Sequence, residues 1–136
     1  MTKLTVAAIA VAAISFCAPA YAGTVRAKSG ATARVADGAT SNFQCLVSKL
    51  EGQGYPVKFM RGYGHGTVRG SLHPSGMALD VNQTARGRTT PRMPHNEISL
   101  AASCGLLSGA VWRNNDSGHF QKGGYSGRRH ARRHRR

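Results

Sequence analysis

The sequence is short of acidic residues, of aromatic residues and of long apolar runs. Only 5 of its 136 residues are Asp or Glu, against 19 Lys or Arg, so the formal net charge is +14. Aromatic residues make up 7% of a chain too short for two packed domains, so we expect one domain with a modest core. The longest apolar run, residues 4–16, is shorter than the roughly 20 residues that cross a membrane, so we expect no transmembrane segment.

The first 22 residues have the layout of a secretory signal peptide. Lys3 precedes the apolar run, and Ala20 and Ala22 form a small-x-small cleavage site. We therefore expect residues 1–22 to be removed on export. A retained anchor or a lipidated Cys17 is the alternative interpretation.

Cysteine is scarce, and the three cysteines cannot all pair within one molecule. Removal of residues 1–22 takes away Cys17 and leaves Cys45 and Cys104. Because an exported protein folds in an oxidising compartment, where pairing is the default, we expect a disulfide between these two. Two unpaired thiols are the alternative.

Composition divides the rest of the chain into a linker and a domain. Residues 23–39 are small and polar without sustained periodicity, which predicts a linker. The domain is expected over residues 40–124. A capping box at residues 41–44 predicts a helix that ends at Gly52, and its apolar stripe contains Phe43, Leu46, Val47 and Leu50.

Shorter patterns predict the other elements of this domain. A second helix is expected near residues 96–103, and strands over residues 55–63, 77–81, 110–112 and 119–121. Alternation in residues 77–81 places the larger apolar side chains on one face of a strand and Asp80 on the other. Helices interleaved with short strands predict an α+β fold.

Residues able to carry chemistry gather around these predicted loops and strands, namely Ser71, His73, Asp80, Asp116 and His119. Two histidines and one carboxylate form a zinc ligand set that leaves a fourth position open for water, as catalytic zinc sites do. His73 and Asp80 are separated by a Pro-Ser-Gly turn that lets the chain reverse and bring both to one metal. A surface histidine and a turn aspartate are the alternative interpretation.

Two motifs connect these residues to a known family. Residues 71–80, SLHPSGMALD, match Ser-x-His-x-x-Gly-x-Ala-x-Asp, and this resembles the signature of the zinc D-Ala-D-Ala carboxypeptidase and L-alanyl-D-glutamate peptidase family. Asp116, three positions before His119, resembles the second motif of that family. The resemblance covers about residues 41–122 and implies the hedgehog/DD-peptidase fold, a small antiparallel sheet with helices on one side.

The resemblance also implies roles for single residues. His73, Asp80 and His119 would bind Zn²⁺, Asp116 would be the general base, and Ser71 would help to orient the substrate. Zinc lowers the pKa of a water molecule that it holds to about 7, so a nearby carboxylate can take the proton as a peptide bond is attacked. Asp116 as a helix or turn cap is the alternative.

The implied substrates are the D-amino-acid-containing stem peptides of peptidoglycan, cut by a monomeric carboxypeptidase or endopeptidase in the periplasm or cell wall. An arginine should stabilise the oxyanion or bind a stem-peptide carboxylate, and the candidates are Arg61 and Arg69. The family often has its arginine after a Ser-Gly-Tyr turn, whereas Arg61 precedes the turn here. The sequence therefore leaves both arginines open.

The C-terminal end, residues 125–136, is dominated by Arg and His. Six arginines fall in its last nine residues, so we expect a disordered tail. Such a tail would be drawn to anionic groups of the cell envelope, and nucleic acid is less favoured because no aromatic residues are interleaved for base stacking. A non-catalytic cationic module that binds cell wall or nucleic acid, on the same fold, is the alternative function.

Overall fold

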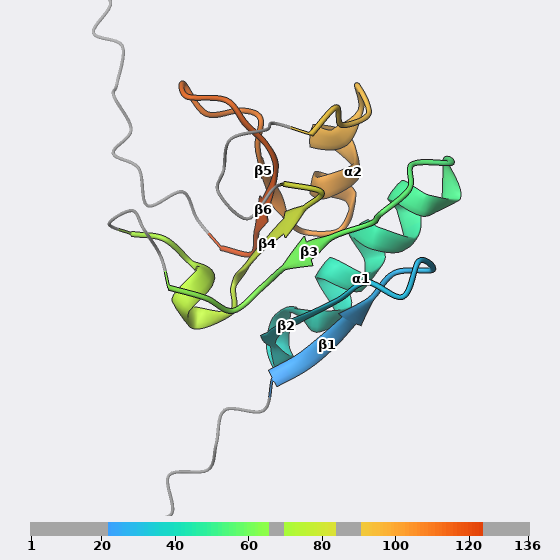
Figure 1. Ribbon diagram of the computed structural model, residues 1–136. Coiled ribbons are helices and arrows are strands. Elements are labelled where there is room, and N and C mark those ends of the chain that lie inside the picture. The colour runs from blue at the N-terminus through green and yellow to red at the C-terminus, as the bar shows by residue number, and fades with distance from the viewer. Residues whose placement is uncertain (1–21, 66–69, 84–90, 124–136) are drawn as a thin grey trace, which may run out of the picture.

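The computed structural model describes residues 22–65, 70–83 and 91–123 (Figure 1). Residues 1–21 of the expected signal peptide, Arg69 and the tail lie outside the described residues. Two antiparallel sheets and two α-helices alternate along the described chain, which confirms the α+β class.

An N-terminal hairpin occupies the segment expected to be a linker, so that prediction over residues 23–39 is wrong. Strand β1 (Ala22–Arg26) pairs with β2 (Thr32–Ala36) in antiparallel register. Val25 and Val35 are fully buried, and their neighbours in each strand face outward. The alternation is weak in the sequence because its inward positions are held by only a few small apolar residues.

Helix α1 (Asp37–Gly52) follows β2 directly and buries the predicted stripe of Phe43, Leu46, Val47 and Leu50. The predicted capping box is wrong, because the helix begins at Asp37 and no side chain caps it. Asp37 lies in the first turn, where a negative charge is favourable to the helix dipole. Asn42, expected within the box, instead donates a hydrogen bond to the carbonyl of Cys104.

The second sheet has the order β3-β4-β6-β5, with all neighbours antiparallel. Its strands are β3 (Met60–Arg61), β4 (Ala78–Val81), β5 (Leu107–Gly109) and β6 (Asp116–Gln121). The strand expected over residues 55–63 is limited to β3. Just before it, the backbone N–H groups of Lys58 and Phe59 donate to the side-chain oxygen Oδ1 of Asn82 instead of to a backbone carbonyl. Residues 110–112, also expected to be a strand, form a turn after β5.

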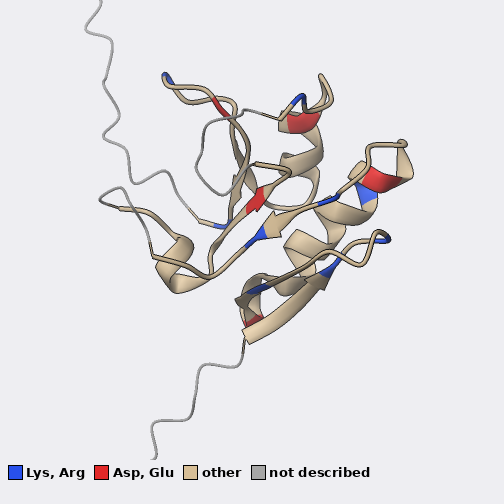
Figure 2. Ribbon diagram, in the orientation of Figure 1, with Lys and Arg blue, Asp and Glu red and all other residues tan. Residues whose placement is uncertain are grey.

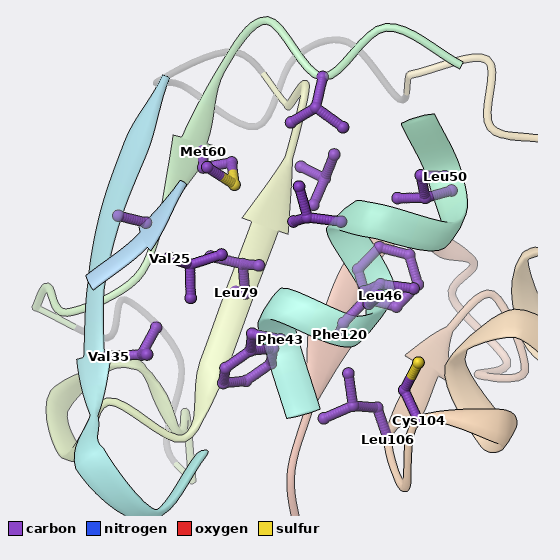
Figure 3. Close-up of a cluster of buried hydrophobic side chains, with 14 of the residues drawn as sticks. Val25, Val35, Phe43, Leu46, Leu50, Met60, Leu79, Cys104, Leu106 and Phe120 are labelled. Atoms are coloured by element: carbon purple, nitrogen blue, oxygen red, sulfur yellow. The ribbon is translucent and has the colours of Figure 1, made fainter. Parts of the chain in front are cut away.

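One face of this sheet packs against the helices, and Figure 3 shows the resulting core. Leu79 of β4 and Phe120 of β6 are fully buried in one cluster with the α1 stripe and with Val25 and Val35 of the hairpin. Because side chains alternate along a strand, Asp80 and His119 point to the other face. Of the buried apolar residues of β4, Leu79 and Val81 belong to the core cluster and Ala78 does not, which confirms the predicted alternation in residues 77–81.

Helix α2 (Glu97–Ser103) lies beside α1 and is joined to it by the Cys45–Cys104 disulfide, as the sequence predicted. The bond closes a separation of 59 residues. Within the described ranges, no helix has the length and apolar character that crossing a membrane requires.

Replacing Val25 by alanine tests whether the hairpin belongs to the core. We expect the free energy of unfolding to fall by about 2 kcal/mol, because a fully buried valine side chain is truncated. Chemical denaturation measures this change. Thr24→Ala, at the exposed position beside it, is the matched control, and equal small effects of both changes would contradict a packed hairpin.

Candidate metal centre

Three strands place charged or titratable residues side by side on the sheet face opposite the core. Arg61 of β3 is paired in register with Asp80 of β4, and Asp80 is paired with His119 of β6. Figure 2 shows a basic position on β3 beside an acidic position on β4. The antiparallel pairing therefore brings together residues that lie up to 58 positions apart (119 minus 61) in the sequence.

His73 reaches the same place from a short 3-10 helix, η1 (His73–Ser75), which precedes β4. The backbone N–H of His73 donates to Ser71 Oγ over 3.4 Å, so Ser71 helps to shape the turn. Gly76 ends η1 with φ of 69°, a backbone conformation that favours glycine, and its carbonyl accepts the N–H of Ala36 at the end of β2. The hairpin thus supports the turn that carries His73.

The side chains of His73, Asp80 and His119, here called the His-Asp-His cluster, converge on one oxygen. His73 Nε2 lies 3.2 Å from Asp80 Oδ1, and His119 Nδ1 lies 2.8 Å from the same atom. All three residues are buried, and one donor atom from each lies within 4.8 Å of the others. The cluster could hold a metal ion.

The outer nitrogen of each histidine is bound to an oxygen atom. His73 Nδ1 lies 2.7 Å from the carbonyl oxygen of Gly62, which can only accept, so Nδ1 carries the proton. His119 Nε2 lies 3.4 Å from Gln121 Oε1. With its proton on Nδ1, a neutral His73 directs the lone pair of Nε2 at Asp80. Outer partners of this kind orient the histidine ligands of metal sites.

Gly62 can hold His73 only because it has no side chain. A Cβ atom at this position would lie 2.0 Å from the carbonyl oxygen of Arg34 in β2. The backbones of the hairpin and of the segment after β3 therefore approach closely, and Tyr63 N–H donates to that same carbonyl over 2.8 Å. The close approach fixes the carbonyl that orients the imidazole.

The inner nitrogens of both histidines face the carboxylate of Asp80, an arrangement that favours a positive charge between them. Burial raises the pKa of Asp80, but the hydrogen bonds from His119 and His73 outweigh it and hold that pKa well below its usual range. Burial lowers the pKa of His73, but the hydrogen bond and negative charge of Asp80 outweigh it and raise the pKa. A proton on His73 or a metal ion in its place supplies the charge.

Asp116 begins β6 and is positioned by a second group of polar side chains. Its Oδ1 accepts a hydrogen bond from Gln83 Nε2 over 2.8 Å, and the same amide donates to the carbonyl of Ser117. Ser117 Oγ in turn donates to buried Glu97, whose other carboxylate oxygen accepts from Ser108. These hydrogen bonds therefore hold Asp116 at the start of β6, three residues before His119.

The sequence did not indicate the residues that hold Asp116 in place or the partners of the histidines. Gln121 follows His119 by two positions on the same strand, so alternation alone could have indicated it. Gln83 and Glu97 carry no such signal, because their contacts depend on how β4, β6 and α2 come together. The ring of Trp112, in the turn after β5, lies 5.0 Å from that of His119, measured between centroids.

The remaining candidates are placed differently. Arg61 contacts the His-Asp-His cluster through Asp80, with Nη2 2.7 Å from Oδ2. Ser71 is bonded to the backbone of the turn rather than to the cluster side chains. The other candidate arginine, Arg69, lies outside the described residues.

Searches with this chain against known protein families, curated proteins and solved structures gave no match.

Proposed function

We propose that this protein is an exported zinc peptidase that hydrolyses peptide bonds in D-amino-acid-containing stem peptides of peptidoglycan. The observation that carries the proposal is the convergence of His73, Asp80 and His119. The outer ring nitrogen of each histidine already contacts an oxygen atom, which orients the ring. His73, Asp80 and His119 are the residues that the resemblance to the D-Ala-D-Ala carboxypeptidase and L-alanyl-D-glutamate peptidase family, with its hedgehog/DD-peptidase fold, assigns to the metal.

The cluster fits zinc by donor type and by spacing. Two ligands at about 2.05 Å from a tetrahedral zinc ion lie about 3.3 Å apart. Asp80 Oδ1 lies 3.2 and 2.8 Å from the histidine nitrogens, and the donor atoms of all three residues lie within 4.8 Å of one another, near enough to share one ion. When bound, zinc supplies a Lewis acid and a water molecule whose pKa is lowered to about 7. Three protein ligands leave room for that water.

Asp116 is the residue that we assign to proton transfer. In peptide hydrolysis, a C–N bond breaks, the carbonyl carbon gains the hydroxyl of water and the leaving nitrogen gains its proton. A carboxylate held in place by Gln83 can take that proton and pass it to the nitrogen. Ser71 shapes the turn that presents His73, and we assign it a part in orienting the peptide there.

Two features support export. The first 22 residues have signal-peptide character, and the Cys45–Cys104 disulfide is of a kind that persists in oxidising compartments such as the periplasm and cell surface. The Arg-rich residues 125–136 would then draw the enzyme to anionic groups of the envelope.

Digestion of purified peptidoglycan tests the proposed function. The zinc-loaded protein should release stem-peptide fragments that mass spectrometry identifies, and these fragments also identify the bond that is cut. A chelator should stop the release, and added zinc should restore it. If zinc-loaded protein binds the wall material but releases no peptide, the chain is the non-catalytic binding module instead.

A further inference from the structure

The carboxylate of Asp80 is shared between two kinds of partner, one for each oxygen. His73 and His119 contact Oδ1. Arg61 holds Oδ2, with Nε donating over 3.0 Å and Nη2 at 2.7 Å. Both guanidinium contacts are made to a single oxygen, so Oδ2 is turned away from the histidines.

We infer that Arg61 is a positioning residue, which holds Asp80 so that Oδ1 alone serves as a metal ligand. The inference rests on the metal site of the proposed function, and it replaces the oxyanion role expected for this arginine. It is carried by the division of the two oxygens and by the register of Arg61 opposite Asp80. An outer partner that orients a ligating carboxylate affects metal affinity, even though it does not touch the metal.

Burial explains why Asp80 depends on this partner. Its side chain is 4% exposed with Arg61 in place, so the guanidinium makes the contacts with Oδ2 that solvent water would otherwise make. Without Arg61, the carboxylate of Asp80 can rotate, and Oδ2 becomes available to the metal ion that Oδ1 would bind. Arg61 is itself 44% exposed, so the truncation removes a surface side chain and leaves the apolar core unchanged.

Zinc affinity, measured by competition with a chromophoric chelator, provides the first test. Arg61→Ala should bind zinc about 10- to 100-fold more weakly than the parent protein, the usual effect of losing an outer partner. Arg61→Lys should recover part of the affinity, because an ammonium supplies the charge without the fork of donors. Lys58→Ala, which removes an exposed cation from the same segment, should bind like the parent.

The visible spectrum of the cobalt-loaded protein provides the second test. The Arg61→Ala spectrum should be weaker, because a second oxygen from Asp80 raises the coordination number of Co²⁺. Parental zinc affinity and a parental cobalt spectrum in folded Arg61→Ala, together with reduced peptide hydrolysis, would overturn the inference and make Arg61 a substrate-binding residue.

The outcome for Arg61 can be separated from the outcome for the proposed function. If the parent binds zinc, the Arg61 variants shift its affinity and no stem peptide is cut, the positioning role holds while the peptidase proposal fails. If the parent cuts stem peptides and Arg61→Ala keeps its metal affinity and spectrum, the peptidase proposal holds and the inference fails. A parent protein that binds neither metal overturns both.

Discussion

Replacing His119 by alanine is expected to abolish stoichiometric zinc binding, whereas the parent protein is expected to bind one zinc ion per chain. His119 offers one of three donor atoms that converge in the His-Asp-His cluster. Loss of a direct ligand should therefore weaken binding by more than the roughly 10- to 100-fold that loss of an outer partner causes. Metal analysis after gel filtration, with a chelator titration for affinity, measures the change.

Two controls separate loss of a ligand from loss of the fold. His95→Ala removes an exposed histidine and should leave zinc binding unchanged. Added zinc should raise the melting temperature of the parent and of His95→Ala, because the ion binds the folded state, but not that of His119→Ala. A folded His119→Ala protein that holds zinc as tightly as the parent would show that the ligand assignment is wrong.

Local periodicity predicted the elements whose pattern is strong over a few residues. The α1 stripe and the alternation around Leu79 were recognised because one residue type recurs on a single face. The hairpin was missed, since its inward positions hold only Val25, Ala33 and Val35 among many small polar residues. These valines are buried by α1 and the second sheet. Because such packing joins segments far apart in the sequence, the local pattern does not predict it.

The residues of the His-Asp-His cluster were predictable from the sequence, but the groups that surround them were not. Spacing and the two motifs that resemble the peptidase family indicated His73, Asp80 and His119, because a turn and two strands bring such residues together. The carbonyl of Gly62 escaped prediction, since its role depends on the close approach of β2 at Arg34. The sequence indicated Arg61 as a candidate for binding substrate or the oxyanion. Its bond to Asp80 follows from the β3–β4 register, which the sequence alone did not provide.

Asp116 was assigned in the same way, and its substitution by asparagine is the most direct test of catalysis. Asparagine keeps the shape of the side chain, and its Oδ1 can still accept the hydrogen bond from Gln83, so the start of β6 should be preserved. The amide cannot take a proton from water. We therefore expect Asp116→Asn to hold zinc like the parent and to lose about 10²- to 10⁴-fold in kcat/KM.

The measurement compares the release of stem-peptide fragments by parent and variant at equal zinc content. Asp37→Asn changes charge by the same amount at an exposed position in the first turn of α1, and it should hydrolyse at the parental rate. A loss of zinc from Asp116→Asn would make the residue part of the metal site. Hydrolysis near the parental rate with zinc retained would mean that another group moves the proton, because no acid–base role could survive the change to an amide.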